Sequence, residues 1–172
     1  LRLGHEAPAL ALLHQITLEA KGMPVALYAR LFLAVSAFKR KEYLAALEQW
    51  NSLIRDHGDH SKRWMFHFVV AESLYRLRQS GPAEKAYRQV MEHAPDPHYQ
   101  AMAAFRIGDV HLDRQNFAQA AAAYFQAAEF YGSRADQFPE VYLNRGEALY
   151  GLGDFRLAER EFSSFLKRFP SY

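Results

Sequence analysis

Small and aromatic residues recur along this chain at an almost constant interval. Four alanines are spaced by 37, 37 and 38 residues; an aromatic residue follows each after four positions, and another apolar residue follows three positions later. The four triplets are Ala46, Trp50 and Leu53; Ala83, Tyr87 and Val90; Ala120, Tyr124 and Ala127; and Ala158, Phe162 and Phe165. Residues at i, i+4 and i+7 share one face of an α-helix. The pattern therefore predicts one amphipathic helix in each repeat.

A second set of small residues precedes the first by 12 residues and defines another helix, and its members are Ala34, Ala71, Gly108 and Gly146. Alanine and glycine let two helix axes approach closely, while the aromatic residue of the other helix fills the space beside them. Each repeat is therefore predicted to be a hairpin of helix A, a short polar turn and helix B. Asp96, before Pro97, and Asp154 are predicted to cap the third helix A and the fourth helix B.

The same phase divides the whole chain into repeats. Moving back 37 residues from the first triplet gives Ala9, Leu13 and Ile16, so residues 1–22 are predicted to be helix B of a preceding repeat. Four complete repeats are predicted to follow, at residues 26–60, 63–97, 97–134 and 136–172. Because the first helix lacks its helix A and the chain begins with leucine, we expect a fragment of a longer protein.

The fourth repeat contains the run Arg145–Phe155, which includes a Gly-Asp-Phe turn, followed by Ala158, Phe162 and Pro170. This arrangement resembles the tetratricopeptide repeat. The resemblance implies an all-α, right-handed superhelical solenoid of stacked antiparallel helix hairpins, whose A helices line a concave groove. The repeats are three or four residues longer than the family's usual 34, and in this they are similar to tetratricopeptide repeats of bacterial envelope proteins.

The groove residues are predicted from the helical phase of each helix A, as those on the face that does not pack against the other helices. The candidates are Tyr28, Leu31, Val35, Phe38 and Lys39 in the first repeat; Met65, Phe68, Glu72, Tyr75 and Arg76 in the second; Met102, Phe105, Asp109, Leu112 and Asp113 in the third; and Glu140, Leu143, Glu147 and Tyr150 in the fourth. They predict an apolar and aromatic floor, suited to a peptide or helix of a partner protein. Aromatic residues at helical spacing are also typical of core packing, and that alternative stays open.

Acidic residues of the groove set become more frequent toward its C-terminal half, at Glu72, Asp109, Asp113 and Glu147. Lys39, Arg76 and Arg106 oppose them. This distribution favours a partner that carries basic as well as apolar residues. The alternative is a solvated face on which neighbouring charges contribute little.

Composition and charge narrow the functional classes. The 172 residues are 50% hydrophobic and 23% charged, as expected of a folded, soluble protein, and they include no cysteine. Thiol catalysis and thiolate metal sites are therefore excluded. The formal charge of +2 is too small to favour binding to nucleic acid or to a membrane surface. No run approaches the roughly 20 apolar residues of a membrane-spanning helix, so direct membrane insertion is not expected.

Two short motifs are considered for metal or phosphate chemistry. Asp56–His60 gathers four side chains that can bind metal, but it falls where a helix must end, which favours a plain connector. Gly151–Gly153 joins two helices rather than a strand and a helix, and it lacks the further glycine of a dinucleotide loop. No nucleophile elbow or phosphate-binding glycine-lysine loop occurs in the sequence. Neither a metal, a cofactor nor catalytic activity is expected.

The repeats and the lack of recognisable chemistry together predict an interaction scaffold. Its groove would bind a peptide segment or helix of another protein, within a bacterial multiprotein assembly. Self-association into a homo-oligomer is the alternative, because the interrupted ends of the array expose apolar helix faces. An RNA-binding helical repeat is disfavoured because the groove residues are not predominantly basic. The sequence leaves the compartment open between cytoplasm and periplasm.

Overall fold

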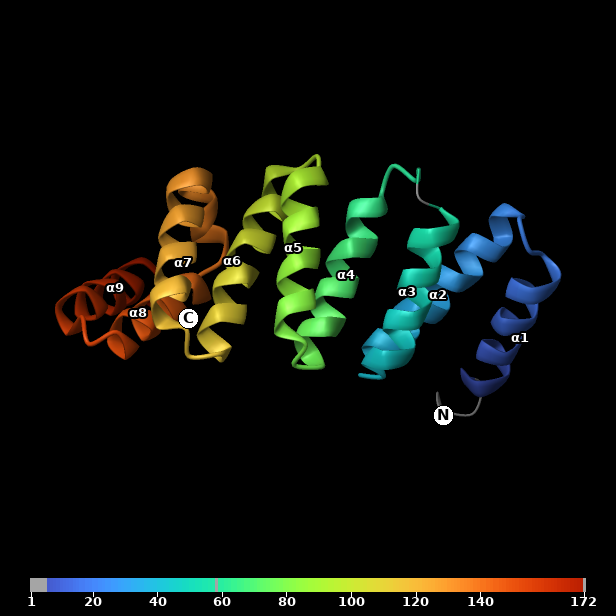
Figure 1. Ribbon diagram of the computed structural model, residues 1–172, viewed down its shortest axis with the longest axis horizontal. Helices are drawn as coiled ribbons and strands as arrows, with labels where there is room; N and C mark the ends of the chain where they lie inside the picture. The colour runs from blue at the N-terminus through green and yellow to red at the C-terminus, as the bar shows by residue number, and fades with distance from the viewer. Residues whose placement is uncertain (1–5, 58, 172) are drawn as a thin grey trace. The chain divides into compact units, whose positions relative to one another are not determined.

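The computed structural model describes residues 6–57 and 59–171 (Figure 1). These residues form nine α-helices, one 3-10 helix and no β-strand, which agrees with the predicted all-α class. The chain divides into two compact units, Leu1–Gln79 and Ser80–Tyr172. The repeat limits given above stay a prediction, and the second predicted repeat, residues 63–97, would extend across the boundary between these units.

The described part of Leu1–Gln79 contains α1 (Glu6–Glu19), α2 (Pro24–Lys39), α3 (Tyr43–Asp56) and α4 (Arg63–Arg76). Each helix packs against the next, so that α2 and α3 lie between α1 and α4 (Figure 1). The buried face of α2 consists almost entirely of alanines, which let neighbouring helices approach closely. Trp50 of α3 and Phe66 of α4 are buried, with ring centroids 5.6 Å apart.

The described part of Ser80–Tyr172 contains α5 (Ser80–His93), α6 (Pro97–Asp113), α7 (Phe117–Tyr131), the 3-10 helix η2 (Gly132–Gln137), α8 (Glu140–Gly151) and α9 (Phe155–Arg168). Consecutive α-helices again pack against each other. A cluster of buried apolar residues draws members from α6, α7, α8 and α9, and it includes the fully buried Tyr124. This unit is therefore held together by one hydrophobic core that these four helices share.

Glycines in two hairpins confirm the predicted close approach of neighbouring helices. A Cβ atom on Gly108 of α6 would lie 2.4 Å from the ring of Tyr124 on α7. A Cβ atom on Gly146 of α8 would lie 2.4 Å from the ring of Phe162 on α9. Neither distance leaves room for a methyl group, so hydrogen is the only side chain that fits without displacing the ring.

The turn after each of α2, α4, α6 and α8 has the same backbone conformation. One residue in each has a positive φ, with values of 64°, 60°, 58° and 82° at Lys41, Arg78, Gln115 and Gly153. In each turn, the amide of the residue after the positive-φ residue donates a hydrogen bond to the carbonyl oxygen five residues before it, as in a Schellman motif. For example, the Asn116 amide donates to the His111 carbonyl oxygen at 2.9 Å. Only the fourth turn has the glycine that this conformation favours, so each of the others stores about 1 kcal/mol of strain.

The two predicted N-caps are also confirmed. The Asp96 carboxylate accepts a hydrogen bond from the His98 amide at 2.8 Å, and the Asp154 carboxylate accepts one from the Leu157 amide at 3.2 Å. Pro97 is the first residue of α6. These caps satisfy amides at helix N-termini that have no partner within the helix, and they fix where α6 and α9 begin.

Candidate functional site

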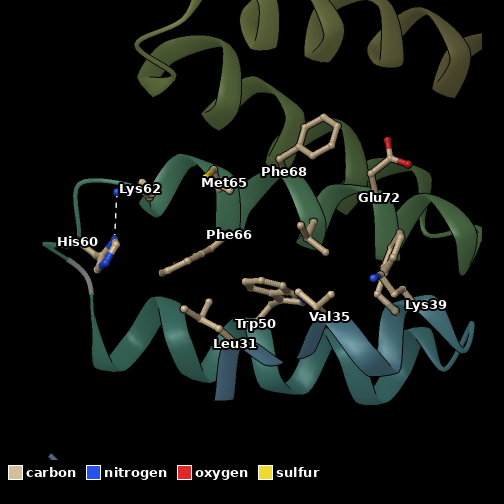
Figure 2. Close-up of a pocket in the computed structure, with 12 residues that line it drawn as sticks. Leu31, Val35, Lys39, Trp50, His60, Lys62, Met65, Phe66, Phe68 and Glu72 are labelled. Atoms are coloured by element: carbon tan, nitrogen blue, oxygen red, sulfur yellow. Dashed lines mark hydrogen bonds between the residues drawn. The ribbon is translucent and has the colours of Figure 1, made fainter. Parts of the chain in front are cut away.

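A cavity of about 630 Å³ lies within the unit Leu1–Gln79 (Figure 2). Its lining comes from α2, α3, the α3–α4 connection and α4: Leu31, Val35, Phe38, Lys39, Trp50, His60, Lys62, Met65, Phe66, Phe68, Val69 and Glu72. The volume falls in the range of about 300–1,000 Å³ that is typical of ligand-binding pockets. Most of the lining side chains are apolar, so the cavity suits apolar groups larger than one side chain.

The two faces of α2 explain why apolar side chains are left for the cavity. Ala26, Ala29, Leu33, Ala34 and Ala37 form its buried face. Leu31, Val35 and Phe38 lie at i, i+4 and i+7, on a different face of the same helix. Because the small residues make the contacts of the buried face, the larger apolar residues remain at the cavity.

Trp50 closes the cavity on the α3 side. Trp50 is 4% exposed, and its indole Nε1 has no hydrogen-bond partner among the described residues. A buried N–H group without an acceptor costs about 1–3 kcal/mol. The indole ring nevertheless contributes a large apolar area between α2, α3 and α4. Its contact with the Phe66 ring forms the inner wall of the cavity.

Polar side chains lie at the two ends of the cavity. Lys62 and His60 lie at one end and Lys39 at the other (Figure 2). Glu72 is the acidic residue of the lining, and it is only 8% exposed. His60 is oriented by its own backbone turn, because its Nδ1 accepts a hydrogen bond from the Lys62 amide at 3.1 Å. The accessible charge at this cavity is therefore positive.

Seven residues predicted for the groove lie together in this cavity: Leu31, Val35, Phe38, Lys39, Met65, Phe68 and Glu72. Three other candidates of the same unit are not part of its lining. Tyr28 and Arg76 are exposed, and Tyr75 is half-buried. Most of the residues that helical phase selected in the first two predicted repeats therefore lie at this one cavity.

Phe105, by contrast, does not lie on an open groove. It is buried in the core of Ser80–Tyr172, and its ring centroid lies 5.5 Å from that of Phe138. Phe138 and Pro139 form the connection between η2 and α8. This connection covers Phe105, whereas the equivalent Leu31 and Phe68 line the cavity.

Asp109 is also buried, and its carboxylate joins three helices. Its Oδ1 accepts hydrogen bonds from the Tyr124 hydroxyl at 2.6 Å and the Asn144 amide at 2.9 Å. Its Oδ2 accepts one from the Arg106 guanidinium at 2.9 Å. The expectation that Asp109 presents a charge to a partner is therefore corrected: its position between α6, α7 and α8 gives it a structural role.

The remaining candidates of Ser80–Tyr172 differ in accessibility. Leu112 and Leu143 are half-buried and pack against the core, and Met102 is half-buried. The exposed candidates are Asp113, Glu140, Glu147 and Tyr150. The ring of Tyr150 contacts that of Phe155, with centroids 5.1 Å apart. With Glu72 and Asp109 buried, the exposed acidic candidates of the groove are Asp113, the last residue of α6, and Glu140 and Glu147 of α8.

Several residues of the cavity were not among the sequence candidates: Trp50, His60, Lys62, Phe66 and Val69. Val69 has a signal in the sequence, because it occupies the position equivalent to the exposed Phe32, 37 residues earlier. Lys62 and His60 have none, because they lie in a connection to which helical phase does not apply.

A second cavity, of about 590 Å³, lies between α5, α6 and α7. Its lining mixes apolar side chains with Arg88, Glu92, His111 and three glutamines. None of its lining residues was among those predicted for the groove. The signal was the run Ala120–Ala123 in α7, two of whose alanines leave this space unfilled.

Within the Asp56–His60 segment, Asp56 ends α3 and pairs with side chains of α2 and α3. The Arg30 guanidinium and the Ser52 hydroxyl both donate to the Asp56 carboxylate. The hydrogen bond from Arg30 holds the pKa of this carboxyl below its usual range. Gly58 lies outside the described residues. Among those described, no three His, Asp or Glu side chains converge as metal ligands would, and no helix has the length and apolar character needed to cross a bilayer.

A family profile described as a tetratricopeptide repeat-like domain matches this sequence twice, at residues 2–144 and at residues 48–169. A search of curated protein sequences gave no match. Among solved structures, MamA (residues 41 to the end) of Desulfovibrio magneticus RS-1 is similar with a TM-score of 0.77 and 17% identity, over 98% of this chain and 88% of that chain.

Two further structures have similar folds. The tetratricopeptide-like repeats of a putative kinesin light chain from Podospora anserina give a TM-score of 0.74 at 14% identity, over 95% of this chain and 86% of that one. A Rap protein complexed with Competence and Sporulation Factor gives 0.65 at 20% identity, over 93% of this chain and 48% of that one. None of these matches indicates a catalytic family.

Proposed function

Because the chain belongs to the tetratricopeptide repeat-like family, we propose that it is a protein-interaction scaffold whose cavity between α2 and α4 receives apolar side chains of a partner protein. The family and the fold of its structural neighbours support a protein partner in general. The cavity supports this particular site, because it is large, apolar and bordered by the exposed Lys39 and Lys62.

The observation that carries the proposal is the apolar surface left accessible at the cavity. Val35 of α2 and Met65 of α4 are each 41% exposed there. Burying such side chains against a partner contributes about 25 cal/mol for each Å² removed from water. Leu31, Phe38 and Phe68 are held half-buried beside them, so the site is largely preformed and loses little conformational entropy on binding.

The identity of the partner is proposed only as a class. The long repeat period favours a component of a bacterial multiprotein assembly. A partner with basic residues stays our prediction for the unit Ser80–Tyr172, where Asp113 and Glu147 are exposed. The partner of the cavity in Leu1–Gln79 faces a different charge, because Lys39 and Lys62 are accessible there and Glu72 is buried.

Peptides selected from a random display library against the purified chain provide probes for this site. We expect Val35→Gln/Met65→Gln to lower their affinity by at least about tenfold, because two apolar contacts are lost at the centre of the site. Both residues are partly exposed, so unfolding by heat should be almost unchanged. Isothermal titration calorimetry measures the affinity and circular dichroism the unfolding.

The matched control is Leu12→Gln/Leu44→Gln. These leucines are 58% and 62% exposed on α1 and α3, and neither lines the cavity. The control should bind every selected peptide as the unaltered chain does. Equal binding by the Val35→Gln/Met65→Gln variant would refute the site. Light scattering tests the alternative that a second copy of the chain occupies the cavity. A concentration-dependent dimer that forms with the unaltered chain and the control, but not with Val35→Gln/Met65→Gln, would identify that copy as the occupant.

A further inference from the structure

An exposed apolar stripe runs along α2 and joins the cavity. Its four members, Val25, Tyr28, Phe32 and Val35, are between 41% and 69% exposed. They are separated by three, four and three residues, which is the spacing of the a and d positions of a helix that packs against another helix. Val35 also lines the cavity, so stripe and cavity form one surface. The stripe is about 15 Å long along the helix axis.

Exposed cations border this surface at both ends. Lys62 lines the cavity and immediately precedes α4, and Arg76, the last residue of α4, follows the lining residue Glu72 by one helical turn. Lys62 and Arg76 are therefore 14 residues, or about 21 Å, apart along the helix. Lys39, at the last turn of α2, lines the cavity at the end opposite Lys62 (Figure 2). Within the described residues no ion pair is formed by any of these three side chains.

The acidic residue of this surface does not balance these cations. Glu72 is 8% exposed, so its carboxylate is not available to pair with a basic residue of a partner. Long-range attraction depends on the summed charge of a surface, and Lys39, Lys62 and Arg76 outnumber this one carboxylate, so the surface favours an anionic partner segment. The groove residues taken together predicted a basic partner, whereas this surface favours an acidic one. The two differ because the exposed acidic candidates of the groove lie in the unit Ser80–Tyr172.

A helix satisfies both features at once. A helix that lies along α2 presents its own a and d residues to the stripe at the same repeating interval. Two residues that are 14 positions apart fall on nearly the same side of such a helix, about 21 Å apart, which matches the cations at the two ends. An extended segment would alternate its side chains every second residue and would not follow this spacing.

We propose that the stripe and the cavity together bind an amphipathic helix of a partner protein, about four turns long, whose apolar face carries carboxylates near both ends. This inference rests on the proposed function, since it assigns the chemistry of the partner to the same cavity. The apolar side chains enter beside Val35 and Met65, and the carboxylates meet Lys62 at one end and Lys39 with Arg76 at the other.

Synthetic helical peptides of about 18 residues test the proposal. All carry leucines at alternating intervals of three and four residues and differ only near their ends, which hold glutamate, glutamine or lysine. Fluorescence anisotropy with the full chain should rank the glutamate peptide first, about tenfold tighter than the lysine peptide at low salt, with a smaller difference at high salt. A proline in the middle of the glutamate peptide should abolish binding, because it breaks the helix.

Charge reversal in the protein provides the second measurement. Lys39→Glu/Lys62→Glu should reverse the ranking, so that the lysine peptide binds best. Arg55→Glu/Lys85→Glu makes the same change of net charge at exposed positions that do not line the cavity, and it should leave the ranking unchanged.

The outcomes separate this inference from the proposed function. If the glutamine peptide binds and loses affinity in Val35→Gln/Met65→Gln, but glutamate confers no preference, the anionic partner is refuted and the cavity stands. If the proline peptide binds as well as its parent, the helix is refuted. If none of the three peptides binds while library-selected peptides do, the amphipathic helix is refuted and the site stands. Failure of both kinds of peptide refutes both proposals.

Discussion

Replacing Asp109 with alanine is expected to destabilise the chain strongly. Asp109 is 9% exposed, and its carboxylate lies between α6, α7 and α8 and accepts hydrogen bonds from Tyr124, Asn144 and Arg106. A hydrogen bond to a charged group contributes about 1.5–3 kcal/mol. The partner side chains of Asn144 and Arg106 are half-buried and regain water, so they recover part of this energy. The buried Tyr124 hydroxyl recovers the least, which leaves an expected loss of roughly 3 kcal/mol.

Urea unfolding followed by circular dichroism measures this loss. Tyr124→Phe should cost about 1.5 kcal/mol, since it removes one of the three hydrogen bonds. A double-mutant cycle of Asp109→Ala and Tyr124→Phe should give a coupling energy of about 1–2 kcal/mol, because the two groups are in direct contact.

Glu147→Ala is the matched control. Glu147 is a second acidic candidate for the groove, but it is exposed on α8, and its replacement should change the free energy of unfolding by less than about 0.5 kcal/mol. If Asp109→Ala were no more destabilising than Glu147→Ala, or if the cycle showed no coupling, then Asp109 would not hold the helices together and the structural role assigned to it would be wrong.

Three further predictions concern the hairpins and the core of Ser80–Tyr172. Gly108→Ala should lower the free energy of unfolding in urea by about 2 kcal/mol. This loss should exceed that of Gly146→Ala, because the Tyr124 ring is fully buried and cannot move aside. A smaller loss than in Gly146→Ala would contradict this reasoning. Gln115→Gly should raise stability by up to about 1 kcal/mol, because glycine relieves the strain of a φ of 58°, and an unchanged or lower urea midpoint would count against the strained turn. Burial and a hydrogen bond to a nearby carboxylate raise the pKa of Tyr142 from 10.0 to about 12. The unfolded chain therefore loses this proton first, so stability should fall as pH rises from 10 to 12, and a Tyr142→Phe variant with an equally steep fall would show that this group is not responsible.

The helices of this chain were predictable because their signals are local and repeated. The triplet that begins at Ala120 marks α7, and the glycine at position 108 marks the close approach of α6. The caps at Asp96 and Asp154 were equally visible, since an N-cap depends on residues within one turn. The left-handed residue Gln115 was not visible, because hydrogen bonds of the turn hold it there against the preference of its side chain.

The candidate site was predictable only in part. Helical phase identified Leu31 and Phe68, which line the cavity, and by the same rule it selected Phe105, which is buried. The three residues hold equivalent positions 37 residues apart, so the repeat pattern cannot distinguish them. They differ because Phe138 covers only Phe105, and this contact depends on the path of the chain between η2 and α8.

The amino-acid sequence by itself determined that this chain forms helical hairpins of the tetratricopeptide type, because the recurrence of small and aromatic residues can be satisfied only by closely packed helix pairs. The tertiary structure decided which residues of a shared helical face remain accessible. At Glu72 and Asp109 the neighbours enclose a charge, and at Val35 and Met65 they leave apolar area exposed. Accessibility depends on side chains that are distant in sequence, and the periodicity of a single helix cannot predict where those side chains lie.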